Sequence, residues 1–123
     1  RPDLVVGVPM STRGLGRRGY DPAYLLALGL SRRLGWPAPP AGLLRKIRET
    51  PPQRQKGATA RRENVRGAYQ CPERASKSLE GRAVLLVDDV VTTGATAESC
   101  ARALRRAGAR SVTVVTLART PYD

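Results

Sequence analysis

Short apolar runs alternate along the chain with longer stretches in which apolar residues recur at helical spacing. The apolar runs at residues 4–8, 84–87 and 112–117 have the length and the branched side chains of buried strands. Between the last two runs, one helical face carries the apolar residues Ala97, Cys100, Ala101 and Leu104. Residues 84–117 therefore predict a strand–helix–strand unit, whose two strands are expected to be parallel with a right-handed crossover.

A second amphipathic helix is expected after the first strand. Asp21 is a preferred N-cap residue, Pro22 suits the first helical position, and Gly35 suits the end of the helix. The apolar stripe between them consists of Ala23, Leu26, Ala27, Leu30 and Leu34. Residues 43–47 and 65–70 each predict a further short strand. The alternation of strands and helices indicates an α/β fold.

The length and composition are those of one globular domain covering residues 1–123, with 41% apolar residues. No apolar run approaches the roughly 18 residues that a membrane-spanning helix needs, so no membrane span is expected. The two cysteines, Cys71 and Cys100, have neither metal-ligand spacing nor the pattern of a disulfide framework. A reducing, cytoplasmic location is the corresponding expectation.

The chain is strongly basic, with a formal net charge of +12 and no histidine. This charge indicates an anionic ligand or partner, either a phosphorylated metabolite or nucleic acid. Two loops carry much of the charge: residues 10–20, which follow the first strand, and a long excursion over residues 45–66. A loop as long as 45–66 in a compact domain is usually either functional or disordered. For residues 10–20, the position after a core strand favours a functional loop over an ordinary flexible connection. For the charge on helices, a solvated face is the competing interpretation.

The stretch after the second apolar run combines acids and hydroxyls. Asp88 and Asp89 follow the run directly, at the expected end of a parallel strand, where ligands of α/β sheets bind. Carboxylates accept hydrogen bonds from vicinal hydroxyls. Residues 92–96 then place Thr and Gly residues at a helix start, which favours an anion. The stretch predicts a site for a sugar phosphate.

Residues 84–96 resemble the phosphoribosyl-pyrophosphate motif of type I phosphoribosyltransferases, which has a hydrophobic strand, two acidic residues and a Thr-Thr-Gly loop. The rest of the chain resembles the ComF family of competence-associated proteins. The residues that carry this resemblance are Arg-Gly-Tyr-Asp at 18–21, Arg-Glu-Thr-Pro-Pro-Gln at 48–53 and Arg-Arg-Glu-Asn-Val-Arg-Gly-Ala-Tyr at 61–69. Members of that family often carry an N-terminal cysteine-rich zinc segment. This chain contains no such segment, so no zinc site is expected in it.

The resemblance implies an open parallel sheet of about four or five strands, with helices on both faces and a mobile basic hood at residues 45–66. It implies that Asp88 and Asp89 bind the ribose hydroxyls and help to hold Mg²⁺. The implied 5′-phosphate loop consists of Val91, Thr92, Thr93, Gly94, Ala95 and Thr96. The implied contacts to pyrophosphate come from Ser11, Thr12 and Arg13, which match by position. The implied hood, with Arg48, Gln53 and Arg61 as its candidate residues, could close over the ligand and exclude water.

The function that the resemblance implies is transfer of a phosphoribosyl group from phosphoribosyl pyrophosphate to an unidentified acceptor, with a link to competence and DNA uptake. Two alternatives stay open at this point. One is a non-catalytic, ligand-sensing adaptor that acts with competence or DNA-processing proteins. The other is a non-specific nucleic-acid binder that uses the basic loops. With 4 Tyr, 1 Trp and no Phe, base stacking has few candidate side chains, so DNA contact would be mainly to phosphates.

Overall fold

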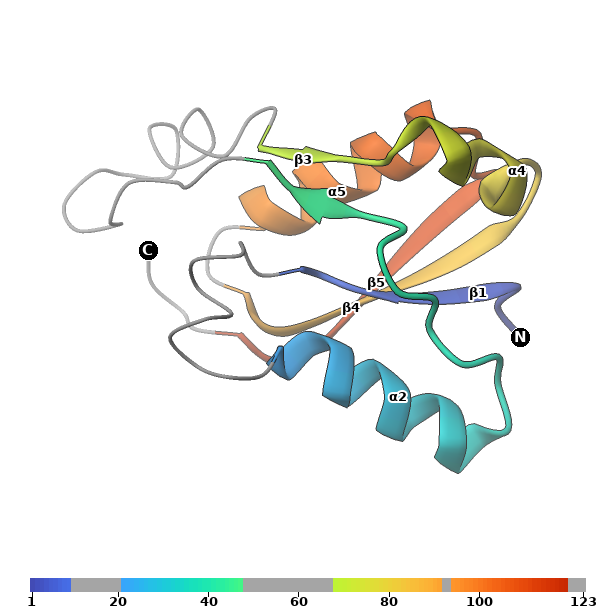
Figure 1. Ribbon diagram of the computed structural model, residues 1–123. Coiled ribbons are helices and arrows are strands. Elements are labelled where there is room, and N and C mark those ends of the chain that lie inside the picture. The colour runs from blue at the N-terminus through green and yellow to red at the C-terminus, as the bar shows by residue number, and fades with distance from the viewer. Residues whose placement is uncertain (10–20, 48–67, 92–93, 120–123) are drawn as a thin grey trace, which may run out of the picture.

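The computed structural model of the protein describes residues 1–9, 21–47, 68–91 and 94–119. At its centre is a parallel sheet of three strands in the order β1-β4-β5, with β4 in the middle (Figure 1). The strands are β1 (Leu4–Gly7), β4 (Ala83–Val91) and β5 (Ser111–Arg119). Helix α5 (Ala95–Arg106) connects β4 to β5, which pair in parallel. The predicted α/β class and strand–helix–strand unit are confirmed.

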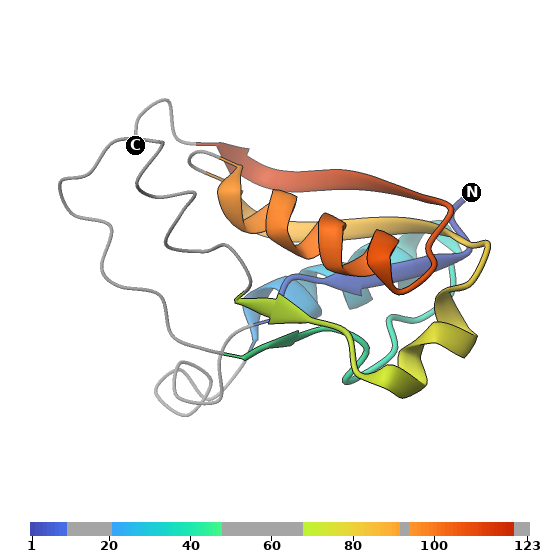
Figure 2. The ribbon, with the colours of Figure 1, turned by 90° about the horizontal axis from the view of Figure 1, so that it is seen from above.

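The number of strands in this sheet is smaller than expected. Within the described ranges the parallel sheet has three strands, and β2 (Arg45–Lys46) and β3 (Tyr69–Gln70) form a separate antiparallel pair. The pair stands apart because its apolar neighbours bury their side chains with those of α5 and do not extend the sheet edge. These neighbours are Leu43, Leu44 and Ala68, together with Tyr69 of β3 itself. Figure 2 shows β2 and β3 beside α5. The expected strand at 65–70 is confirmed only at its end, and its first three residues lie outside the described part.

Helices cover both faces of the sheet, as expected. Helix α2 (Pro22–Leu34) packs on β1 and β4 from one side, and α5 packs on β4 and β5 from the other (Figure 1). The face with α5 also holds a short 3-10 turn, η1 (Glu73–Ala75), and the single-turn helix α4 (Ser76–Leu79). Within the described ranges, no helix is both long and apolar enough to cross a bilayer.

Helix α2 has the predicted ends. The carboxylate of Asp21 accepts a hydrogen bond from the N–H of Tyr24 at 3.3 Å, and Gly35 closes the helix with φ 69°. The apolar stripe differs from expectation at its C-terminal end, because Leu34 is 49% exposed and Ser31 is buried. The buried residues of α2 are spaced four apart, at Ala23, Ala27 and Ser31, so position 31 and not position 34 faces the sheet. The buried Ser31 hydroxyl has no hydrogen-bond partner among the described residues.

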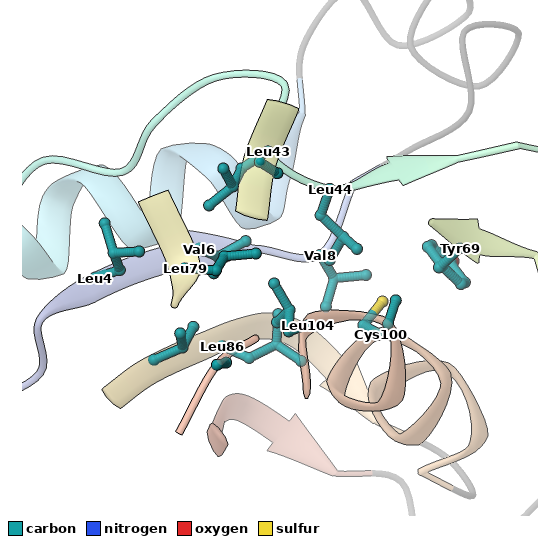
Figure 3. Close-up of a cluster of buried hydrophobic side chains, with 14 of the residues drawn as sticks. Leu4, Val6, Val8, Leu43, Leu44, Tyr69, Leu79, Leu86, Cys100 and Leu104 are labelled. Carbon is teal, nitrogen blue, oxygen red and sulfur yellow. The ribbon is translucent and has the colours of Figure 1, made fainter. Parts of the chain in front are cut away.

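Alternating side chains of β4 build a separate core on each face of the sheet. Leu86 lies in the larger cluster, which α5 and α4 complete through Leu104 and Leu79 (Figure 3). Leu85 and Val87 lie in the smaller cluster beneath α2. Both clusters therefore depend on the same central strand, which also carries the acid pair.

Gly7, the last residue of β1, marks a close approach between that strand and the first turn of α2. A Cβ atom at this position would lie 2.9 Å from the carbonyl oxygen of Ala23 and 3.0 Å from Cα of Tyr24. These neighbours are backbone atoms, which cannot rotate away as a side chain does. The absence of a side chain at position 7 thus allows the N-terminus of α2 to reach the C-terminal edge of the sheet.

We expect Gly7→Ala to destabilise the protein by about 1–3 kcal/mol, because the added methyl must displace α2. Urea denaturation followed by circular dichroism measures the change. Gly29→Ala is the matched control, since a Cβ at this exposed position of α2 meets no atom within 4 Å and alanine favours the helix. Equal stabilities of the two variants would show that α2 does not depend on the contact with Gly7.

Candidate functional site

The acid pair, Asp88 and Asp89, lies where β4 extends beyond the end of β1 at the C-terminal edge of the sheet. Pairing with β1 ends at Gly7↔Val87, and the N–H of Val8 donates one further bond to the carbonyl of Val87 at 2.9 Å. On its other side β4 stays paired with β5, with Asp88 opposite Thr116. The expectation that Asp88 and Asp89 follow the end of the strand is therefore wrong. The strand continues to Val91, because β5 is long enough to pair with it after β1 has ended.

Asp88 is a buried carboxylate, with 7% of its surface exposed. Its Oδ1 accepts a hydrogen bond from the N–H of Asp89 at 2.9 Å. Burial, followed by the neighbouring Asp89 carboxyl and the charge of Asp21, raises the pKa of Asp88 from its ordinary 3.8 to about 7. The ligand-free site thus disfavours full ionisation of the pair. Hydroxyl donors or a cation would favour the ionised form.

Helix α5 begins beside the acid pair, within the same short stretch of chain. Its N-cap, Gly94, has φ 85°, a conformation that other residues rarely adopt. The N–H of Glu98 donates to the carbonyl of Gly94 at 2.8 Å and forms the first helical bond. Ala95 is buried and Thr96 is half-buried in this first turn. A helix N-terminus carries partial positive charge and favours a bound anion.

Some of the residues predicted for the site are brought to this edge by β4 and the start of α5. They are Asp88, Asp89, Val91, Gly94, Ala95 and Thr96. The others lie outside the described residues, and their predicted roles stay predictions. They are Ser11, Thr12, Arg13, Arg48, Gln53, Arg61, Thr92 and Thr93. The hood at 45–66 is described only over residues 45–47, which include β2.

Two residues at this edge were not predicted as part of the site. The hydroxyl of Thr116 lies 3.4 Å from the carbonyl oxygen of Asp89 and 2.8 Å from that of Ala118, so β5 supports the acid segment of β4. Asp21, predicted only as a helix cap, adds its negative charge to the surroundings of Asp88. Neither role has a local sequence signal, because each depends on the pairing of distant segments.

The donor set at this edge suits a cation that arrives with a phosphorylated ligand. Among the residues that the structure describes, no group of three or more His, Cys, Asp or Glu side chains is placed to hold a metal ion. Asp88 and Asp89 supply carboxylate oxygens at one location. Mg²⁺ is commonly held by one or two carboxylates together with substrate phosphates and water. The pair therefore fits a Mg²⁺ ion that is shared with a ligand.

A parallel sheet with an acid pair at its edge, followed by a glycine-capped helix, is the arrangement expected of a phosphoribosyltransferase-type protein. Residues 2–123 match the phosphoribosyl transferase domain family, and the chain belongs to that family. In structure it is similar to a glutamine phosphoribosylpyrophosphate amidotransferase from B. subtilis, with a TM-score of 0.61 and 28% identity. That match covers 95% of this chain and 22% of the other. A structure of the allosteric regulatory enzyme of purine biosynthesis matches equally well.

The curated proteins that are similar in sequence are DNA utilization and competence proteins. The chain is 38% identical over 121 residues to DNA utilization protein YhgH of Escherichia coli strain K12, covering 97% of this chain and 50% of that protein. It is 35% identical over 118 residues to competence protein F of Haemophilus influenzae, covering 96% and 51%. The chain thus spans about half the length of these relatives. The resemblance to the type I fold and to the ComF group is confirmed.

Proposed function

We propose that this domain binds phosphoribosyl pyrophosphate, or a closely related ribose phosphate, at the C-terminal edge of the sheet. The ribose 2′ and 3′ hydroxyls would donate hydrogen bonds to Asp88 and Asp89. The 5′-phosphate would bind the loop and helix start at residues 92–96. The observation that carries this proposal is a buried carboxylate, Asp88, placed one short loop away from the N-terminus of α5.

Electrostatics support a ligand that has hydroxyls at one end and phosphate at the other. The pKa of Asp88 is raised because burial and Asp89 disfavour its charge. Hydroxyl donors or a shared cation would offset that unfavourable burial. The start of α5, by contrast, favours negative charge. A ribose phosphate matches both preferences within one small molecule.

Mg²⁺ is the cation that we propose for this site. Asp88 and Asp89 would hold it together with phosphate oxygens of the ligand. When bound, it would neutralise charge on the pyrophosphate group. We also propose that Arg13 of the loop after the first strand, and Arg48 and Arg61 of the hood, add cationic contacts to the ligand through guanidinium groups that match phosphate geometry.

The reaction that we propose is transfer of the phosphoribosyl group. At C1 of the ribose, the bond to pyrophosphate breaks and pyrophosphate leaves with the bonding electrons. A bond to the acceptor's nucleophile forms, and the acceptor's proton passes to solvent or to a group on the ligand. The domain's contribution is positioning and charge stabilisation, which a site without histidine can supply.

A non-catalytic role in DNA handling is the second candidate, because the curated relatives are named DNA utilization and competence proteins. In that role the ribose-phosphate site would sense a ligand while competence or DNA-processing proteins act as partners in the cytoplasm. Binding without transfer is the property that separates this role from the enzymatic one.

Calorimetry with phosphoribosyl pyrophosphate and Mg²⁺ tests the site. We expect saturable binding by the wild-type chain and a loss of at least about tenfold in affinity for Asp88→Asn/Asp89→Asn, because charged acceptors of hydrogen bonds contribute roughly 1.5–3 kcal/mol each. Asp3→Asn, at an exposed carboxylate before β1, should bind as the wild type does. No binding by the wild type, or equal binding by the double variant, would contradict the assignment.

Pyrophosphate release then separates transfer from sensing. Release that requires both Mg²⁺ and an added acceptor supports the transferase. Saturable binding without release across nucleobases, amines and nucleosides supports the adaptor.

A further inference from the structure

Exposed arginines gather at the edge of the sheet opposite to the acid pair. Arg82 directly precedes β4 and Arg110 directly precedes β5, and parallel strands begin at the same edge. Arg105 and Arg106 form the last turn of α5, which returns the chain to that edge. All four are exposed, and we call this set of residues the arginine edge. In Figure 2 the C-terminal end of α5 and the starts of β4 and β5 lie on the same side of the molecule as the N-terminus.

Backbone hydrogen bonds join the two turns that carry these arginines. The N–H of Arg110 donates to the carbonyl of Arg82 at 2.8 Å, and the N–H of Gly81 donates to the carbonyl of Gly108 at 3.0 Å. The guanidinium of Arg110 also donates to the carbonyl of Gly81 at 3.3 Å. The turns before β4 and β5 therefore form one connected surface.

The positive charge of this surface is only partly balanced. Arg110 pairs with Asp3 at 4.0 Å, and Glu80 lies against Gly108 in the adjoining turn. Within the described part of the chain, Arg82, Arg105 and Arg106 form no ion pair. Arginines in the last turn of a helix also complement its dipole, which accounts for Arg105 and Arg106. It does not account for Arg82, which precedes a strand.

We propose that the arginine edge binds the phosphate backbone of a nucleic-acid strand without reading its sequence. Guanidinium groups match the geometry of phosphate oxygens. The segments that carry these arginines, residues 80–82 and 105–111, contain no aromatic residue for base stacking and none of the exposed large apolar residues. The surface therefore lacks the apolar anchors that protein interfaces and membrane insertion use. Backbone contact alone is expected to be independent of sequence and strongly dependent on salt.

This surface is separate from the ribose-phosphate site and does not depend on it. Arg82 directly precedes β4 and Asp88 lies within its C-terminal half, about 20 Å away at the rise of an extended strand. Nucleic acid and a ribose phosphate can therefore occupy the domain together.

Fluorescence anisotropy with labelled 20-nucleotide strands and duplexes of mixed sequence tests the proposal over a range of salt concentrations. We expect Arg82→Gln/Arg106→Gln to bind severalfold more weakly and to have a shallower salt dependence. The slope of log affinity against log salt should fall by about 0.7 per lost contact for single strands and about 0.9 for duplexes. Arg102→Gln is the matched control, because Arg102 is an exposed arginine of α5 that pairs with Glu98 at 4.0 Å, and it should retain wild-type affinity and slope.

The proposal is overturned if the double variant binds like the wild type, or if Arg102→Gln loses as much affinity. It is also overturned if wild-type protein binds neither strands nor duplexes, including the case in which it binds anionic phosphatidylglycerol vesicles instead. Thermal melts verify that each variant is folded. If the change at Arg106 lowers the melting temperature, the single variant Arg82→Gln replaces the double variant, because Arg82 lies outside any helix. The expected change in the salt slope is then half as large.

Discussion

Asp88→Asn is expected to stabilise the ligand-free protein at pH 8 by roughly 2–4 kcal/mol, because the pKa of Asp88 in the folded chain, about 7, lies far above its ordinary value of 3.8. The folded state holds a proton between these two values that the unfolded chain releases. Wild-type stability therefore falls as the pH rises from about 4 to 7, and the full penalty is present at pH 8. Asparagine does not ionise, and its amide oxygen can still accept the hydrogen bond from the N–H of Asp89.

Urea denaturation at pH 4 and pH 8, in EDTA and without phosphate, measures this effect. At pH 4 the variant and the wild type should differ by no more than about 0.5 kcal/mol. Asp3→Asn is the matched control, because the exposed Asp3 carboxylate accepts a hydrogen bond from the N–H of Ala83 at 2.9 Å and pairs with Arg110. That variant should gain no stability at pH 8. A gain for Asp88→Asn that is the same at both pH values would contradict the ionisation argument.

Leu104→Ala is expected to destabilise the protein by about 2–5 kcal/mol, since Leu104 has no exposed surface and lies in the cluster that joins α5 to β4 (Figure 3). The remaining cavity would be lined by residues such as Leu86 of β4 and Leu79 of α4. Because regular elements hold these residues in place, they cannot move far enough to fill the cavity. The midpoint of urea denaturation measures the change, with an unchanged denaturant slope showing that unfolding stays two-state.

Leu25→Ala supplies the comparison, because Leu25 is also helical but 51% exposed. Its loss should be no larger than about 1 kcal/mol. Similar losses for the two variants would mean that α5 is not held to the sheet by this cluster.

The position of Asp88 is unfavourable for the stability of the ligand-free protein. A buried carboxylate beside another acid is seldom retained for stability, because burial disfavours its charge. Perturbed pKa values of this kind cluster at functional sites. The expected gain in stability of Asp88→Asn and the expected loss of ligand affinity in Asp88→Asn/Asp89→Asn are two consequences of the same geometry.

Local sequence patterns were sufficient to predict the elements that hold the site. The capping residues of α2, Asp21 and Gly35, could be identified because capping depends on neighbouring residues alone. The inner face of α5 follows from an apolar periodicity of 3.6 residues, and the core strands follow from continuous runs of branched apolar residues. The acid pair and Gly94 could be assigned to one site because β4 and α5 are consecutive in the chain.

Only the tertiary structure decided the features that depend on segments distant in sequence. Pairing with β5 carries β4 past Asp88 to Val91, and packing on α5 separates β2 and β3 from the parallel sheet. The pKa of Asp88 depends on burial, which no local pattern records.

The same distinction applies to charge. The sequence by itself determined that the chain is basic and that residues 84–96 resemble the phosphoribosyl-pyrophosphate motif. It did not show that Arg82 and Arg110 lie in adjoining turns, because that contact follows from the parallel pairing of β4 and β5. Patterns along the chain thus determined the elements and the motif, whereas pairing and burial determined which charges meet and how strongly each is perturbed.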